Sequence, residues 1–254
     1  MSKLVRLAAA LFAAVLSCQA FAQEKLTVGT EGAYPPFNNL TASGDLVGFD
    51  IDIAKALCAR MAVECSFVAV DWDGLIPALQ AGKIDIIAAS LTITEERRKH
   101  VLFTHKYYAT PLAIVARKEA GLTATEPSAF AGKTLGVQGQ TWQAEYAART
   151  FGAAGAEMKL YPSQVEAMLD LSAGRLDAVL SDKIQLIDWM KTEGAGCCAM
   201  VGDVPGTAAE AGLAVRLDDM ELRNRLETAL DAILADGTYD AIRKRYFDFD
   251  IYGR

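Results

Sequence analysis

Hydrophobic and polar positions follow two alternating periods along the chain. Segments with strand-like alternation or short apolar runs lie at 26–30, 67–70, 84–87, 112–116, 134–137 and 178–180. Segments with apolar residues at helical spacing lie at 51–61, 75–80, 142–150, 164–172 and 222–234. In the first of these, Ile53, Leu57 and Met61 share one helix face. Because strands and helices take turns, the pattern predicts an α/β protein with parallel sheets covered by helices.

One unit of this pattern occurs twice. Residues 79–87 and 171–179 share a helix end, a glycine, a basic residue and a buried strand. Polar residues follow each strand, Ser90 and Thr92 in the first unit and Asp182 in the second. In open α/β sheets, ligands bind beyond the carboxyl ends of the strands. The repeat therefore predicts two lobes that face each other across a cleft.

The order of the segments suggests how the chain is divided between the lobes. We expect a first lobe from 23–109 and 209–254, a second lobe from 113–205, and hinges at 110–112 and 206–208. The Thr110-Pro111 step suits a crossover strand, because proline fixes its own φ and favours an extended residue before it.

The N-terminus has the pattern of an export signal. Lys3 and Arg6 precede an apolar run at 7–16, and Ala20-Phe21-Ala22 forms a small-x-small cleavage site. Residues 1–22 are therefore predicted to be a signal peptide, and the mature chain is expected to be a soluble protein of the periplasm. A lipoprotein signal with Cys18 as the lipidated residue is the alternative, but Leu16 fits that pattern poorly.

Charge narrows the range of partners. The chain carries a formal charge of −7, and loss of the two basic residues of the signal gives about −9, with no basic stripe. Nucleic acid is therefore not an expected partner. An acidic surface favours cationic ligands mildly, although net charge mainly affects solubility and association rate.

The cysteines point to crosslinking more than to metal binding. Cys58 and Cys65 flank an apolar segment, and in an oxidising compartment this spacing predicts a disulfide. Cys197 and Cys198 are adjacent, and a vicinal disulfide, two free thiols or a bond to another chain all remain open. The chain has two histidines, neither near this pair in sequence, so no metal site is expected.

Catalytic motifs are missing, whereas a candidate anion-binding residue is present. The sequence has no Gly-x-Ser-x-Gly elbow and no phosphate-binding glycine loop. Arg97 would lie in the first turn of a short helix capped by Thr94 or Thr92. A cation opposes the helix dipole there, so its placement needs a reason. A bidentate grip on a carboxylate is one explanation, and a solvated surface position is the other.

Several stretches together resemble a known family. They are Gly48-Phe49-Asp50-Ile51-Asp52, residues 75–79, 91–97 and 173–177, and the ending 236–248. In this order and spacing they resemble the periplasmic polar-amino-acid-binding proteins of the lysine/arginine/ornithine and histidine class. These are the soluble components of ATP-driven importers, and the similarity covers the mature chain. The resemblance implies a type II two-lobed fold whose lobes are joined by two crossover strands.

The resemblance also implies groups that bind the α-carboxylate of an amino acid. Arg97 matches the arginine that forks onto this carboxylate. Ser90 and Thr92 match positions that supply a backbone amide and a hydroxyl. Thr141, or the neighbouring amide of Trp142, would add donors from the second lobe.

Other matched positions would bind the rest of the ligand. Asp182 matches the acid that pairs with the α-ammonium. Tyr34 and Trp72 match two aromatic residues that sandwich the ligand side chain, which attract a cationic side chain by cation–π contact. Glu31 matches the acid that meets a distal cation, and its alternative role is that of a turn residue.

The resemblance implies that the protein captures a free, cationic amino acid and delivers it to the membrane permease subunits of the importer, with no catalysis and no cofactor. We expect it to act as a monomer. Ala89 replaces a serine of the family, and Trp142 replaces a small hydroxyl residue, so selectivity could shift toward an opine such as octopine or nopaline. A cyclohexadienyl dehydratase on the same scaffold and a receptor-associated sensor are the rival hypotheses.

Overall fold

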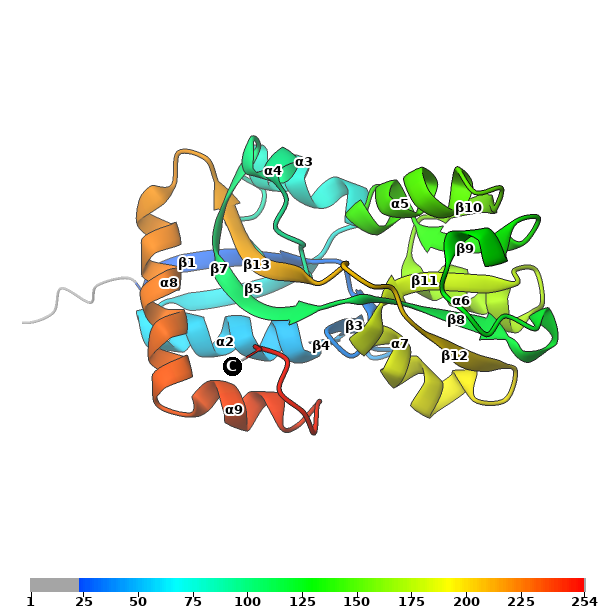
Figure 1. The fold of residues 1–254 in the computed structure, drawn as a ribbon. Coiled ribbons are helices and arrows are strands. Elements are labelled where there is room, and N and C mark those ends of the chain that lie inside the picture. Colours follow the sequence, from blue (N-terminus) through cyan, green and yellow to red (C-terminus); the bar gives the residue numbers. More distant parts are fainter. Residues whose placement is uncertain (1–22, 254) are drawn as a thin grey trace, which may run out of the picture.

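Two mixed sheets form the framework of the protein, for which a computed structural model describes residues 23–253. Within these residues each sheet has five strands, and helices pack on both faces (Figure 1). The predicted signal peptide, residues 1–22, and the alternative lipidation at Cys18 lie outside the described residues.

The first sheet is built from both ends of the described chain. Its strand order is β5-β1-β6-β13-β7. The bounds are β5 (Glu64–Ala69), β1 (Lys25–Thr30), β6 (Ile86–Ile87), β13 (Ala209–Arg216) and β7 (Val101–Thr110). Strand β1 is parallel to β5 and β6, whereas β13 runs antiparallel to β6 and β7.

The second sheet is built from the middle of the chain, in the order β10-β9-β11-β8-β12. The bounds are β10 (Glu157–Tyr161), β9 (Thr134–Gln138), β11 (Ala178–Asp182), β8 (Leu112–Arg117) and β12 (Cys198–Asp203). Strands β10, β9 and β11 are parallel, and β8 is antiparallel to both β11 and β12.

Both sheets correct the expectation of purely parallel strands. Each sheet has three consecutive parallel strands and two further strands at one side. These two are β13 and β7 in the first sheet, and β8 and β12 in the second. The long strand β7 was absent from the sequence-based prediction, because its polar residues His105 and Lys106 break the apolar pattern. The α/β class itself is confirmed.

Helices cover the sheets, and a small third sheet lies beside the first. The helices are α2 (Phe49–Met61), α3 (Leu75–Gln80), α4 (Glu95–Arg98), α5 (Trp142–Ala147), α6 (Gln164–Ser172), α7 (Lys183–Trp189), α8 (Met220–Ala235) and α9 (Thr238–Arg243). The small sheet consists of β2 (Ala33–Tyr34), β3 (Asn38–Leu40) and β4 (Leu46–Val47). A 3-10 turn, η1 (Trp72–Gly74), precedes α3.

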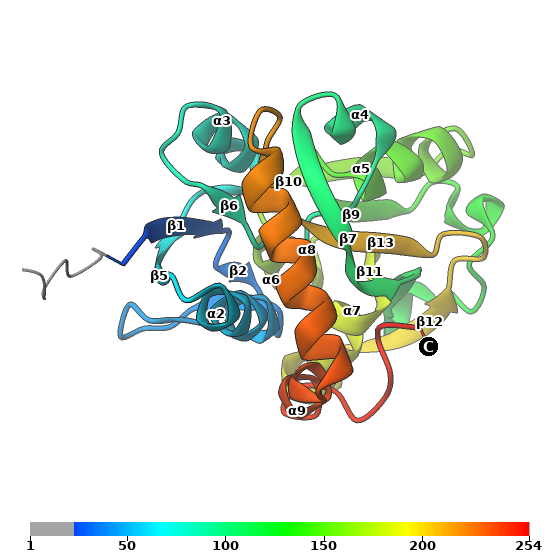
Figure 2. The same ribbon diagram turned by 90° about the vertical axis from the view of Figure 1, so that its left-hand side faces the viewer.

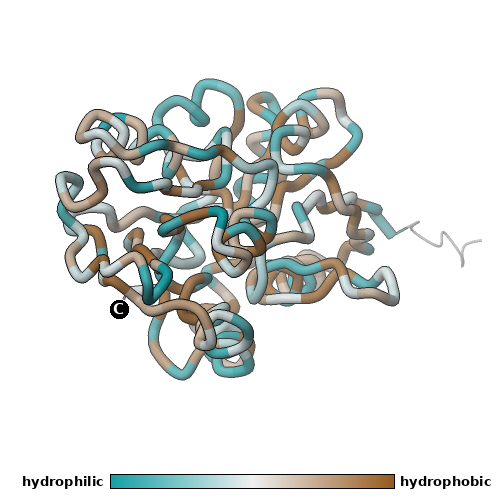
Figure 3. The backbone as a smooth tube through the Cα atoms, turned by 90° about the vertical axis from the view of Figure 1, so that its right-hand side faces the viewer, coloured by the Kyte–Doolittle hydropathy of each residue, from teal (hydrophilic) through white to brown (hydrophobic). Residues whose placement is uncertain are grey.

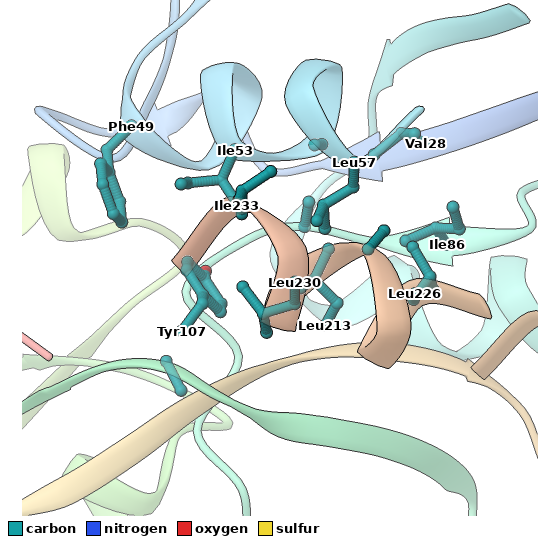
Figure 4. Close-up of a cluster of buried hydrophobic side chains, with 14 of the residues drawn as sticks. Val28, Phe49, Ile53, Leu57, Ile86, Tyr107, Leu213, Leu226, Leu230 and Ile233 are labelled. Atoms are coloured by element: carbon teal, nitrogen blue, oxygen red, sulfur yellow. The ribbon is translucent and has the colours of Figure 1, made fainter. Parts of the chain in front are cut away.

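The core of the first lobe lies between the sheet and the helix pair α2 and α8. Ile53 and Leu57 of α2 face Leu230 and Ile233 of α8 (Figure 4). Figure 2 shows α8 running along this side of the lobe, near α2. Helix α3 covers the opposite face of the sheet with a separate apolar cluster that includes Leu79. Burial on both faces explains why the central strands are almost entirely apolar.

The second lobe is also layered. Leu112 and Ile114 of β8 pack with α5 on one face, whereas Ala113 and Val115 pack with α6 and α7 on the other. Successive residues of a strand point to opposite faces, which explains this division. The hydropathy colouring of Figure 3 shows hydrophobic stretches in the interior and hydrophilic ones in many outer loops.

Two connections join the lobes. Strand β7 continues into β8 through Pro111, and the chain returns from β12 to β13 (Figure 1). Ile184 of α7 packs into the core cluster of the first lobe, so the two lobes are in direct contact. The hinges at 110–112 and 206–208, and the lobe boundaries around them, stay predictions.

The predicted disulfide between Cys58 and Cys65 is present, and it ties the end of α2 to β5. Cys197 and Cys198, whose state the sequence left open, form a vicinal disulfide. Among residues 23–253, no helix is long and apolar enough to cross a membrane. In the same part of the chain, no cluster of three metal-binding side chains occurs.

The contact between α2 and α8 can be tested by truncating Leu230, which is fully buried. We expect Leu230→Ala to lower the free energy of unfolding by about 3 kcal/mol, because it removes apolar contacts and leaves a cavity. Urea unfolding followed by circular dichroism measures this loss. Leu217→Ala is the control, since Leu217 is 48% exposed, and it should cost less than about 0.5 kcal/mol. Equal losses would contradict the assigned core.

Candidate functional site

A small cavity between the lobes, called the inner cavity below, brings together polar side chains from the ends of several strands. Its volume is about 10 Å³, the space of one water molecule, so a larger ligand fits only after the groups around it move apart. Glu31 follows β1, Ser90 follows β6, and Asp182 is the last residue of β11. The carboxyl ends of the strands thus meet at one place, as expected for ligand sites in α/β proteins.

Most of the residues predicted to bind a ligand line this inner cavity. They are Glu31, Tyr34, Trp72, Ser90, Thr92, Thr141 and Asp182. Arg97 and Trp142 do not line it, whereas Ala89, Gln138 and Gln143 do. The ligand-binding role of each residue stays a prediction, which the contacts below support to different degrees.

Asp182 is a buried acid whose hydrogen-bond partners are neutral. Its carboxylate accepts hydrogen bonds from the Tyr34 hydroxyl at 2.9 Å and from the Gln143 amide at 3.2 Å. Burial raises the pKa of Asp182 to about 6, although these two bonds and the positive charge of Arg97 act in the opposite direction. A cation placed at this carboxylate would therefore be strongly favoured.

Glu31 is the second acid of the cavity. The Gln138 amide donates to its carboxylate at 2.6 Å across the interface between the lobes. Burial raises the pKa of Glu31 to about 7, and the negative charge of Asp71 adds to this effect. The charge of the Glu31 carboxylate is thus met by one neutral donor only. A cation bound beside it would be favoured, as at Asp182.

Arg97 lies beside the inner cavity, at the start of α4. Thr94 caps this helix as predicted, since its hydroxyl accepts the Arg97 backbone N–H at 3.2 Å. The guanidinium donates to the carbonyl oxygens of Thr92 at 3.0 Å and Gln140 at 3.5 Å, and it stacks over the Trp72 ring at 5.2 Å. Burial lowers the pKa of Arg97 to about 10, so a carboxylate bound here would stabilise the charge.

The side chain of Trp142 points away from the inner cavity, and the predicted role of its backbone amide stays a prediction. Its indole packs on the core of the second lobe and meets the Tyr146 ring edge to face at 6.1 Å between centroids. Trp142 is accordingly absent from the lining of the inner cavity. Thr141 caps α5 by accepting the Ala144 N–H, and its own hydroxyl donates to the Gln138 carbonyl. The side chain of Thr141 thus shapes the loop that carries Gln138.

Ser90 is held by a buried network that the sequence did not reveal. Its hydroxyl donates to Asp50 at 3.0 Å, and its backbone N–H donates to the Tyr107 hydroxyl at 3.1 Å. Both donors thus point into the first lobe, although the residue lines the inner cavity. Ser90 adopts a left-handed φ of 52°, which this network stabilises.

Asp50 is the centre of this network. Besides Ser90, it accepts hydrogen bonds from the Tyr107 hydroxyl at 2.7 Å and the Asn38 amide at 2.9 Å. The Asn38 oxygen in turn accepts the Gly32 N–H, next to Glu31. Burial raises the pKa of Asp50, and the three donors oppose that rise. Asp50 therefore positions the loops that carry both Ser90 and Glu31.

The sequence gives only weak signals for the site residues that its analysis did not predict. Gln138 ends a strand and Gln143 lies in the first turn of α5, so strand-end reasoning could have selected Gln138 but not Gln143. Asp50 belongs to the stretch 48–52 that carries the family resemblance, but a single acid on a helix does not disclose its buried partners. The lining of the inner cavity includes no histidine or cysteine, so it does not assemble a nucleophile and base of the Ser/His/Asp or Cys/His type.

Comparisons with known proteins find relatives over nearly the whole chain. Residues 26–249 match the bacterial extracellular solute-binding proteins, family 3. The L-arginine-binding protein of Pseudomonas aeruginosa is 44% identical over 258 residues, covering 99% of this chain and 99% of that protein. The lysine/arginine/ornithine-binding periplasmic protein of Escherichia coli is 40% identical, covering 91% and 90%. The solved structure of an ancestral arginine-binding protein bound to arginine matches with a TM-score of 0.83 and 37% identity, covering 89% and 99%.

The role of Asp50 can be tested by Asp50→Asn, which puts an amide donor where three donors already converge. We expect the free energy of unfolding to fall by about 2–3 kcal/mol, since buried donors lose an ionised acceptor. Urea unfolding measures it. Asp45→Asn, at an exposed acid of the β3–β4 turn, is the control and should change it by less than about 0.5 kcal/mol. A loss at Asp50 no larger than the control would refute this role.

Proposed function

Because the chain belongs to the bacterial extracellular solute-binding proteins of family 3, we propose that it captures a free cationic amino acid between its two lobes. It then presents this ligand to the permease subunits of an ATP-driven importer. Three relatives are named for arginine, for lysine, arginine and ornithine, and for histidine. These relatives are binding proteins, and the protein accordingly performs no chemistry on its ligand.

The observation that carries this proposal is the presence of two buried acids in the lining of the inner cavity and of one guanidinium beside it. Asp182 and Glu31 both have a pKa raised by burial, and the hydrogen bonds to them come from neutral groups. Arg97 bonds to carbonyl oxygens. A basic amino acid carries two cations and one carboxylate, so it complements all three charges.

Binding would replace contacts that the lobes make with each other. The Tyr34 hydroxyl reaches Asp182 of the other lobe, and Gln138 reaches back to Glu31. The Trp72 indole N–H also donates to the Gln140 carbonyl at 3.1 Å across the same interface. An α-ammonium at Asp182 and a distal cation at Glu31 would bridge the lobes more strongly than these neutral donors, and so favour the closed form.

The cellular location that we propose is supported by the sequence and by the relatives. Relatives are named as periplasmic binding proteins. We propose that the signal peptide at 1–22 directs the chain to the periplasm, and that it works there as a monomer. In this account Arg97 and Thr92 hold the α-carboxylate, Asp182 holds the α-ammonium, and Glu31 meets the distal cation, with Tyr34 and Trp72 beside the side chain.

The anchor at Glu31 is tested by titration calorimetry of refolded, ligand-free protein with arginine, lysine, ornithine, histidine and glutamine. We expect arginine to bind, and Glu31→Gln to weaken that binding by at least about 1 kcal/mol, because a charge-assisted bond is lost. Glutamine has no distal cation, so its affinity should change less. Tight binding of glutamine in place of the basic amino acids would contradict the cationic assignment.

The raised pKa values predict how affinity depends on pH. A cation binds the ionised carboxylates, so protons on Glu31 and Asp182 compete with the ligand as pH falls through about 7 and about 6. Affinity should be greatest near pH 8 and fall by about twentyfold by pH 6, about tenfold through Glu31 and about twofold through Asp182. Calorimetry in buffers of different ionisation enthalpy should show proton release on binding near pH 6.5.

The control for this pH dependence is Glu31→Gln, which removes the group that titrates near pH 7. The variant should keep only the weaker dependence that Asp182 contributes. An affinity that stays constant from pH 8 to pH 5.5 in the unaltered protein would contradict the assignment of both acids.

A further inference from the structure

A second, much larger cavity, called the outer cavity below, opens next to the inner one. Its volume is about 880 Å³, and both lobes contribute to its walls. Glu31 and Trp72 line both cavities, whereas Ser90, Thr92 and Asp182 line only the inner one. The two cavities therefore meet at the Glu31 end.

This arrangement orients a bound basic amino acid, given the proposed function. With its α-ammonium at Asp182 and its carboxylate near Thr92, the ligand extends its side chain toward Glu31. The distal nitrogen then lies at the boundary between the two cavities. Space for a substituent is thus available at the distal nitrogen, whereas Asp182 does not line the outer cavity and offers no such space beside it.

The charge of the outer cavity selects what such a substituent can carry. Glu31, Asp71, Asp73 and Glu166 lie in its lining, which includes no lysine, arginine or histidine. Glu166 is engaged by Ser163 at the start of α6, and Asp73 by the Gln140 amide. The summed negative potential favours a group that keeps its positive charge and disfavours an added carboxylate.

Apolar and aromatic surfaces of the same cavity complement an alkyl group. Leu160 is 64% exposed, Leu40 47% and Val165 36%, and all three line the cavity. The rings of Trp72 and Tyr161 also contribute to its wall. Acids combined with aromatic faces are a general means of binding alkylated cations.

We propose that the outer cavity is a subsite for alkyl groups on the distal nitrogen of the ligand. N-alkylated arginines and lysines are then ligands of this protein together with the free amino acids. Octopine is different, because its additional carboxylate is attached to the α-nitrogen. It would therefore lie near the carboxylate of Asp182, away from the outer cavity.

The proposal is tested by calorimetry of the refolded, ligand-free chain 23–254. The probes are arginine, symmetric dimethylarginine, lysine, Nε-isopropyl-lysine and octopine. We expect each alkylated ligand to bind within tenfold of its parent and octopine to bind at least a hundredfold more weakly than arginine. Alkylated ligands that bind a hundredfold more weakly than their parents would overturn the subsite and leave the proposed function intact. Failure of arginine and lysine to bind would instead refute the proposed function.

A pair of matched variants locates the substituent. Val165 and Leu169 are both exposed residues of α6, one helical turn apart, but only Val165 lines the outer cavity. Val165→Trp should weaken Nε-isopropyl-lysine at least fivefold and leave lysine within twofold, whereas Leu169→Trp should change neither. Leu160→Trp, on β10, should repeat the effect of Val165→Trp. If Val165→Trp and Leu160→Trp affect both ligands alike, or neither, the substituent lies elsewhere and the proposal is wrong.

Discussion

A buried carboxylate has to be matched by donors or by a cation, and this constraint organises the cleft. Asp50 meets it within the protein, through the hydroxyls of Tyr107 and Ser90 and the amide of Asn38. Asp182 and Glu31 meet it incompletely, through neutral donors only: Tyr34 and Gln138 from the facing lobe, and Gln143 from the lobe of Asp182 itself. The first acid is therefore structural, and the other two remain available for a ligand.

The Asp50 network and the contacts of Asp182 and Glu31 divide differently between the lobes. The Asp50 network lies wholly within the first lobe and fixes Ser90 and, through Asn38, the turn after Glu31. The bonds that change on opening are those between the lobes, at Asp182 and at Glu31. The half of the site that belongs to the first lobe is thus held in place without any contact to the second lobe.

Regular elements with clear boundaries could be predicted from the sequence. Helices α3 and α6 were placed to the residue, since periodic apolar positions end at a glycine in both cases. Strand β7 was missed because two polar residues interrupt its apolar pattern, and the antiparallel additions to the sheets depend on pairing between distant segments. Local patterns do not encode such pairings.

Prediction of the site from the sequence has the same limit, because contacts between distant segments are not visible in local patterns. Glu31, Ser90 and Asp182 follow strands, so their meeting at one sheet edge could be anticipated. The partners of Asp50 come from three separate segments, and only the folded chain shows that they converge. The direction of the Trp142 side chain could not be predicted, because it is set by packing against Tyr146, which position in a helix turn does not reveal.

The interleaved order of the first sheet has a consequence for biogenesis. Strand β13 lies between β6 and β7, and α8 packs on α2, so residues after 208 complete a lobe that begins near residue 25. The second lobe comes from one continuous stretch, so it can assemble before the C-terminal segments are available. The first lobe has to wait for the last helices. A chain that ends before residue 209 thus leaves the facing edges of β6 and β7 unpaired, and such edges favour aggregation.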